Sequence, residues 1–144
     1  MRNTMTTGLL EPVGHSNLEL VDSAEDVRGR KVIDREGQDV GKVDEVWMDH
    51  EQRHARFLSV KSGDILGIGG ERYLVPVEAI TFDGDRVAVN ATADRITQGP
   101  QVDQIRPDDA ASLETGRPKI AEVYDFYAVK DPFWSPTYQQ PRWQ

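Results

Sequence analysis

Between Val27 and Ala91 the sequence consists of short apolar runs separated by turn residues, with no long stretch of helical periodicity. The runs are rich in β-branched and aromatic residues, and glycine or charged residues fill the gaps between them. Runs of this kind indicate strands joined by short turns. The five predicted strands are KVID (31–34), VGKVDEVWMD (40–49), ARFLSVK (55–61), ERYLVPV (71–77) and RVAVNA (86–91). Five short strands in succession favour a small antiparallel barrel or sandwich.

The length of the chain limits this fold to one domain. Its 144 residues, 38% of them hydrophobic, suffice for one modest core but not for two independent ones. Residues 1–26 mix Gly, Pro, Asn and Ser, and we interpret them as an extended N-terminal arm. The barrel then occupies residues 27–100, and residues 101–144 form a C-terminal extension.

The composition excludes several classes of function. The 25 acidic and 17 basic residues give a net charge of −8, and the sequence has no cluster of Lys and Arg of the kind that nucleic-acid binding requires. The same acidity disfavours adsorption to an anionic lipid surface. There is no cysteine, no apolar run of about 18 residues and no apolar core of a signal peptide. We therefore expect a soluble cytoplasmic chain.

The C-terminal extension contains a helical pattern. ASLE (111–114) can form one helical turn, and Pro118 can occupy the first position of a helix, where its missing N–H is tolerated. The residues that follow at helical spacing and form one apolar face are Ile120, Val123, Tyr124 and Tyr127. The sequence therefore predicts a short C-terminal helix.

The last residues of the chain, KDPFWSPTYQQPRWQ, are rich in proline and aromatic side chains. Such a segment cannot form a core of its own. It either frays or lies on another surface, which belongs to its own barrel or to a neighbouring protein. The candidate partner-binding residues are Phe133, Trp134, Tyr138 and Trp143.

The segment His50–His54 reads HEQRH and matches the H-E-x-x-H pattern of zinc proteases. That pattern binds zinc on a helix, where both histidines face the same way. Here it lies between two predicted strands, and the one remaining histidine, His15, is in the arm. A hairpin loop is the better interpretation, and we expect neither a metal site nor a catalytic residue. The glycine-rich GDILGIGG (63–70) lacks the spacing of a nucleotide-binding loop and predicts an extended hairpin tip.

The segment RGRKVIDREGQDVGKVDEVWMD (28–49) resembles the opening of a PRC-barrel domain, with its R-G-x-x-V, V-G-K-V and W-x-D pattern. WMDHEQRHARFLSV (47–60), RYLVPVEAI (72–80) and DRVAVNATADRITQGP (85–100) are similar to the cytoplasmic domain of the H subunit of purple-bacterial photosynthetic reaction centres. SLE (112–114) followed by KIAEVYDFYAV (119–129) resembles the C-terminal segment of that family. The resemblance covers about 26–129.

This resemblance implies a mainly β fold, a small antiparallel PRC-barrel with a short C-terminal helix and extended termini. It also implies a non-catalytic subunit on the cytoplasmic face of a photosynthetic membrane, capping the electron-transfer core near its quinone side. The implied partners are the membrane-embedded L-type and M-type subunits, with an antenna or a separate membrane-anchor subunit as further candidates. Quinone and pigments would be bound by those partners and not by this chain. The H subunit begins with a transmembrane helix and a linker, and this sequence has neither pattern.

The resemblance also implies three proton-path candidates, Asp49, Glu51 and Arg56. Asp49 and Arg56 match members of the family's proton-delivery group, and Glu51 is next to Gln52, where the family has a glutamate. Two further acidic positions of the family are Ser59 and Lys61 here. Asp49 has an alternative role, as a strand-end carboxylate that pairs with Arg56 or with an N–H of the turn.

A second function remains open, which is that of a free-standing PRC-barrel protein that self-associates and acts as an adaptor. The long hairpin at 63–70 favours it, because free-standing PRC barrels have a longer loop at this position.

Overall fold

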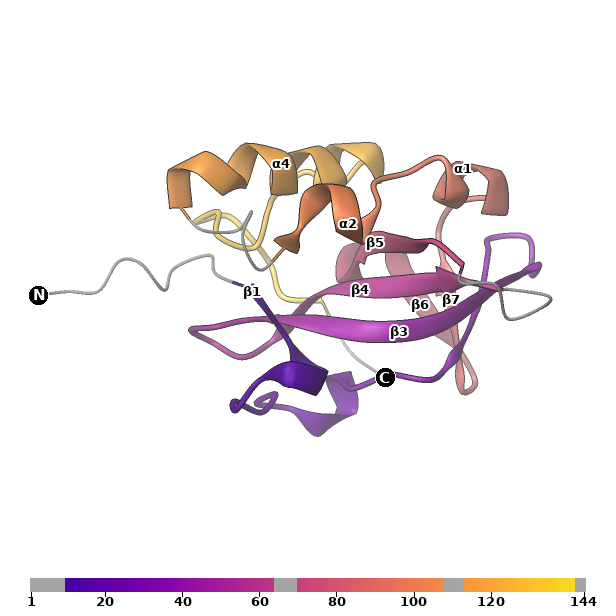
Figure 1. The fold of residues 1–144 in the computed structure, drawn as a ribbon, viewed down its shortest axis with the longest axis horizontal. Coiled ribbons are helices and arrows are strands. Elements are labelled where there is room, and N and C mark those ends of the chain that lie inside the picture. The colour runs from indigo at the N-terminus through magenta and orange to yellow at the C-terminus, as the bar shows by residue number, and fades with distance from the viewer. Residues whose placement is uncertain (1–9, 64–69, 108–112, 142–144) are drawn as a thin grey trace, which may run out of the picture.

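The long strand β3 (Asp39–Asp49) organises the sheet, because three other strands pair with it. The computed structural model describes residues 10–63, 70–107 and 113–141 (Figure 1). The remaining strands are β1 (Leu10–Pro12), β2 (Lys31–Ile33), β4 (Ala55–Ser62), β5 (Arg72–Pro76), β6 (Ile80–Asp83) and β7 (Arg86–Val89). They form one curled sheet in the order β5-β4-β3-β2-β7-β6. β1 lies outside this order and pairs with residues 47–49 at the end of β3. The predicted mainly β, barrel-like fold is confirmed.

All five predicted strands are present, and two more were not predicted. β1 comes from the arm, where three residues pair antiparallel with the end of β3. β6 lies between two of the predicted strands and forms a hairpin with β7. The pairing of β2 with β7 is parallel, so the sheet is not wholly antiparallel. Residues 64–69, the tip of the predicted glycine-rich hairpin, lie outside the described residues.

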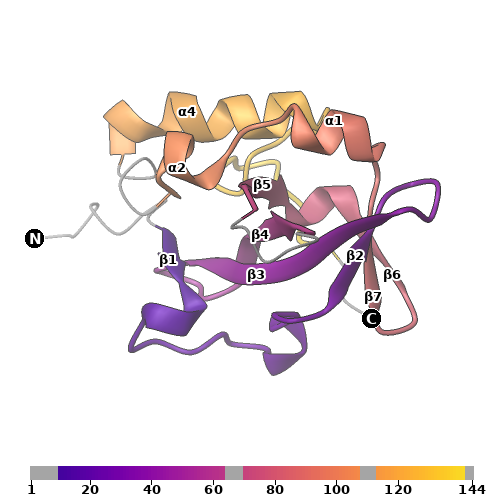
Figure 2. The same ribbon diagram turned by 45° about the vertical axis from the view of Figure 1, so that its right-hand side comes forward.

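Short helical segments surround the sheet. The three-residue 3-10 turns are η2 (Val13–His15), η3 (Ser23–Glu25) and η4 (Val77–Ala79), and the α-helices are α1 (Ala93–Thr97), α2 (Val102–Ile105) and α4 (Leu113–Phe126). In both views the α-helices lie on one side of the sheet and the N-terminal arm on the other (Figures 1 and 2). None of the helices in the described part of the chain is long and apolar enough to cross a membrane.

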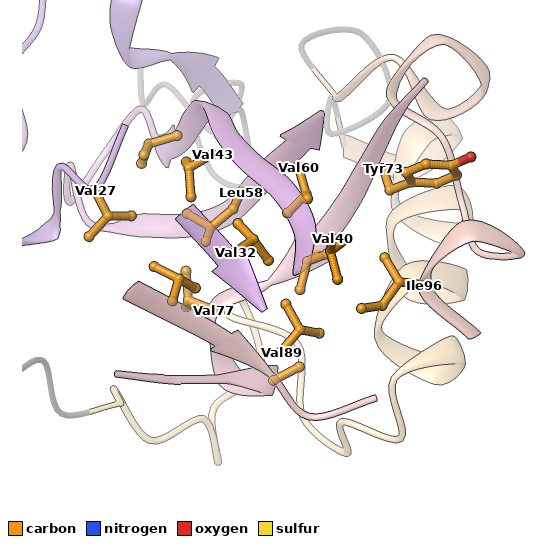
Figure 3. Packing of buried hydrophobic residues seen from close by; sticks show 14 of the residues in the cluster. Val27, Val32, Val40, Val43, Leu58, Val60, Tyr73, Val77, Val89 and Ile96 are labelled. Atoms are coloured by element: carbon orange, nitrogen blue, oxygen red, sulfur yellow. The ribbon is translucent and has the colours of Figure 1, made fainter. Parts of the chain in front are cut away.

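The concave face of the sheet holds the larger of two hydrophobic clusters. Valine dominates it, and side chains from the strands, from Val27 before β2 and from α1 meet there (Figure 3). Its buried members include Val27, Val32, Val43, Leu58, Val60, Val75, Val77, Val87, Val89 and Ile96. Val87 and Val89 are fully buried while Asn90 is exposed, which is the two-residue alternation of a half-buried strand.

The opposite face of the sheet is covered by the C-terminal extension. The buried members of this second cluster are Leu10, Trp47, Phe57, Leu74, Ile105, Ile120, Val123 and Tyr124. Residues 55–60 of β4 are all buried, because this strand has the barrel core on one face and the C-terminal segment on the other. The extension therefore completes the fold and is not an appendage to it.

The predicted position of Pro118 at the start of a helix is wrong. Helix α4 begins at Leu113, and Pro118 lies inside it. An interior proline removes one backbone hydrogen bond and disfavours a helix. Here Pro118 is exposed, while Ile120, Val123 and Tyr124 on the predicted apolar face are buried against the sheet. Burial of that face offsets the lost hydrogen bond, so tertiary packing and not local propensity determines where α4 begins.

Replacing Ile120 with alanine tests whether α4 belongs to the folded core. Ile120→Ala removes a fully buried side chain, so we expect it to lower the free energy of unfolding by about 2–4 kcal/mol in urea denaturation. Glu122→Ala is the control, because Glu122 is exposed on the same helix and its loss should change stability by less than about 0.5 kcal/mol. Equal effects of the two variants would contradict the packing described here.

Candidate functional site

A β-bulge places Arg56 beneath the C-terminal tail, which is the segment 130–141 that follows α4. Trp47 pairs with Phe57 and Met48 with Ala55, so Arg56 has no partner residue on β3. Ala55 belongs to the barrel core, whereas Phe57, two residues later, belongs to the cluster on the opposite face. The extra residue breaks the two-residue alternation of the strand, as a bulge does. Arg56 becomes one of the largest fully buried side chains, with 1% of its surface exposed.

The guanidinium group of Arg56 contacts three different segments. Its Nε donates to Asp49 Oδ1 at 2.9 Å, which joins the two strands of the hairpin. One terminal nitrogen donates to Gln52 Oε1 in the loop, and the other donates to Gln140 Oε1 in the tail, both at 2.8 Å. A buried charge is tolerated only when it is paired and hydrogen-bonded, and these partners fulfil that requirement.

Aromatic rings of the tail complete the surroundings of Arg56. The guanidinium lies 5.0 Å from the centre of the Phe133 ring and 5.4 Å from that of Tyr138, which is the range of cation–π contacts. Trp134 packs edge-on against Tyr124 of α4, and the N–H of Phe133 donates to the Tyr124 hydroxyl at 3.3 Å. Three of the predicted partner-binding residues, Phe133, Trp134 and Tyr138, therefore contact their own domain. Trp143 lies outside the described residues.

Asp49 has both of the alternative contacts considered for it. It pairs with Arg56, and its carboxylate also accepts hydrogen bonds from the N–H of Gln52 at 2.6 Å and of His54 at 3.2 Å. The carboxylate therefore caps the hairpin turn and balances the buried charge at once. Glu51, the third proton-path candidate, is exposed in the loop between the strands.

A second carboxyl group, that of Glu78 in η4, lies on the tail side of the cluster. The hydroxyl of Tyr138 donates to Glu78 Oε2, while the buried Oε1 has no hydrogen-bond partner among the described residues. Burial raises the pKa of Glu78 above its ordinary value of 4.5, although the Tyr138 hydrogen bond and the charge of Arg56 lower it in part. Burial and the neighbouring Glu78 also raise the pKa of Tyr138. The cluster thus contains a carboxyl group that gains a proton more readily than an exposed glutamate.

The histidines of the HEQRH segment lie in the loop between β3 and β4, so the predicted hairpin loop is confirmed. His50 Nδ1 contacts the carboxylate of Glu11, and His54 Nδ1 lies 2.9 Å from Glu25 Oε2. Both glutamates belong to the N-terminal arm, and Glu25 Oε1 also accepts from the N–H of Ala55 at 2.7 Å. In the part of the chain that the structure describes, no three His, Cys, Asp or Glu side chains are grouped to hold a metal ion.

Sequence reasoning found Asp49 and Arg56 and placed Tyr124 on the apolar face of the helix, but it missed Glu78 and Gln140. The hydrogen bond between Tyr138 and Glu78 joins residues 60 positions apart, and the one between Arg56 and Gln140 spans 84 positions. No local pattern links such distant residues. The one signal in the sequence was the aromatic tail itself, because aromatic side chains without a core of their own pack on another surface.

Glu78→Gln tests the raised pKa. An acid with a raised pKa in the folded state holds its proton longer than in the unfolded state, so stability falls as the pH rises from 4.5 through the raised value. The variant lacks this fall, so we expect its stability relative to the wild type to increase with pH across that window in urea denaturation. Glu71→Gln, at an exposed site, is the control variant. A stability difference that does not change with pH for Glu78→Gln would contradict the assignment.

Comparison with known protein families supports the resemblance in its broader form. The PRC-barrel domain matches residues 20–96, which is more than half of the chain and includes the strands from β2 to β7. The match begins within the arm and ends in α1, so α2, α4 and the tail lie beyond it. No curated protein matches the chain. The chain belongs to the PRC-barrel family.

Proposed function

We propose that this PRC-barrel protein is a non-catalytic subunit of a photosynthetic reaction centre, of the same kind as the H subunit. It would lie on the cytoplasmic face of the membrane-embedded core, near the quinone side, and assist proton delivery. The L-type and M-type subunits would bind it, and an antenna or a separate anchor subunit would add contacts. Quinone and pigments would remain with those partners.

The observation that carries the proposal is the row of ionisable side chains around Arg56. It begins at exposed Glu51 in the hairpin loop, continues through buried Asp49 and Arg56, and ends at Tyr138 and Glu78 beneath the tail. Arginine stays protonated at physiological pH, so Arg56 would set the local potential and carry no proton itself. The group on which the proposed proton delivery depends is the Glu78 carboxyl, which has a buried oxygen with no hydrogen-bond partner among the described residues.

The C-terminal extension gives the proposal its second support. The segment 112–129, which resembles the H subunit, lies beyond the PRC-barrel match and forms most of α4. Because α4 and the tail cover the sheet above Arg56, the ionisable cluster is shielded from water on that side. Such shielding suits a subunit that separates a quinone region from the bulk solvent.

Two departures from the H-subunit pattern limit the proton route to this cluster. Ser59 is buried and accepts a hydrogen bond from Trp47 Nε1 at 2.7 Å, so the position is used for packing. Lys61 is a cation where the family has an acid. A proton route along β4 beyond Phe57 therefore lacks its carboxylates.

Co-sedimentation with photosynthetic membranes of the organism that encodes the chain tests the proposal. We expect the full-length protein to sediment with membranes that contain assembled reaction centres and to remain in solution with membranes stripped of them. Flash-induced proton uptake by the reconstituted complex is expected to be slower with Glu78→Gln than with the exposed-site control Glu71→Gln.

A protein that stays wholly soluble beside assembled reaction centres would contradict this function. A homodimer at micromolar concentration with no other partner would instead favour the free-standing adaptor. Unchanged proton uptake with Glu78→Gln, in a complex that still assembles, would remove the proton route and leave the capping role.

A further inference from the structure

Four cationic residues form one row across the sheet, although they are far apart in the sequence. Lys31 on β2 pairs with Lys42 on β3, Lys42 pairs with Lys61 on β4, and Lys61 pairs with Arg72 on β5. Residues directly opposite each other in neighbouring strands point to the same face, and strands lie about 4.8 Å apart. The row therefore carries four positive charges over roughly 14 Å of a protein whose net charge is −8.

The residues at the two ends of the row each have an acidic partner, whereas the two in the middle have none within the described ranges. Lys31 pairs with Asp39 at 3.8 Å, and Arg72 pairs with Asp44 at 2.8 Å. Within the described ranges, no carboxylate lies within ion-pairing distance of Lys42 or Lys61. Like charges directly opposite each other destabilise a sheet. A sequence that keeps such a conflict commonly does so for function.

The three lysines of the row line one cavity. Its volume is about 770 Å³, within the range of small-molecule sites. Its other walls include Val40 and Gly41 of β3, Gly63 just after β4, and Ala93 and Thr97 of α1. Asp39 lies at this cavity as well, where it partly offsets Lys31. The cavity therefore has one wall that carries three lysines and a second wall formed by α1.

The helical wall is fixed in place by Asp34 at the end of β2. Asp34 is buried, and its carboxylate accepts hydrogen bonds from the N–H groups of Ala93, Gln38 and Glu36 at 2.8–2.9 Å. The bond to Ala93 joins the first residue of α1 to the turn that connects β2 with β3. The two sides of the cavity are therefore held at a set separation by one side chain.

We propose that this cavity binds a phosphate-bearing ligand with several adjacent negative charges, such as the oligophosphate part of a small molecule. Lysine binds phosphate as a point charge and needs no bidentate geometry. All the cations in the cavity are lysines, and the arginine of the row is already paired with Asp44. A short ligand fits better than a long polyanion, because the net charge of −8 on the whole chain would repel a nucleic acid.

Titration of the full-length protein with sodium tripolyphosphate at low ionic strength tests the site. We expect saturable one-to-one binding by calorimetry and a rise in melting temperature with ligand. Lys42→Gln/Lys61→Gln should weaken the affinity about tenfold or more, because two ammonium groups are removed. Without ligand, the same variant should melt about 2 °C higher than the wild type, because the opposed charges are gone.

The matched control is Lys119→Gln/Lys130→Gln, which changes the net charge equally at two exposed lysines outside this cavity. It should bind tripolyphosphate within about twofold of the wild type. Equal weakening by both double variants, no saturable binding by the wild type, or equal affinity for citrate would overturn the proposal.

A phosphate group can also belong to a lipid headgroup, so a second arm uses phosphatidylcholine vesicles with and without phosphatidylglycerol. Binding to tripolyphosphate alone supports a free ligand. Binding to the anionic vesicles that is lost in the Lys42→Gln/Lys61→Gln variant supports a headgroup in the same pocket. Binding to neither probe contradicts both.

Discussion

The burial of the Arg56 guanidinium is the constraint on which the rest of the architecture around the C-terminal tail depends. A buried cation destabilises a fold unless every donor has a partner, and no single segment of this chain supplies all of them. Asp49 comes from the end of β3, Gln52 from the hairpin loop and Gln140 from the tail. Folding of the hairpin and docking of the tail are therefore coupled through one side chain.

Docking of the tail and α4 gives the small sheet a second covered face. A PRC-barrel sheet with one covered face would expose Trp47, Phe57 and Leu74 to water. Helix α4 and the tail bury these side chains, and the sheet acquires a second hydrophobic cluster. The polar cluster of Arg56, Asp49, Glu78 and Tyr138 lies at the edge of that apolar contact. Raised pKa values of Glu78 and Tyr138 follow from the same burial that stabilises the extension.

The strands were predictable from sequence because turn residues and valine-rich runs are local signals. The three-residue β1 was not, since its pairing with β3 depends on a long-range contact of the arm. Pro118 misled the prediction of the helix start, because burial of Ile120 and Val123 outweighs one lost hydrogen bond. The Asp49–Arg56 pair was accessible because both residues flank one loop. Glu78, Gln140 and the row from Lys31 to Arg72 were not, because only the topology of the sheet and the bulge at Arg56 bring such distant residues together.

Hydrogen–deuterium exchange of the full-length protein tests the coupling of the tail to Arg56 most directly. The N–H groups of Phe133, Ser135 and Tyr138 are hydrogen-bonded, and their exchange reports whether the tail is docked. We predict that these amides are protected in the wild type. We also predict that Arg56→Lys, which keeps the charge but loses the forked donors, speeds their exchange about tenfold or more while β7 stays unchanged. Exchange of the wild-type tail at the rate of an unstructured peptide, or equal protection in Arg56→Lys, would contradict the account.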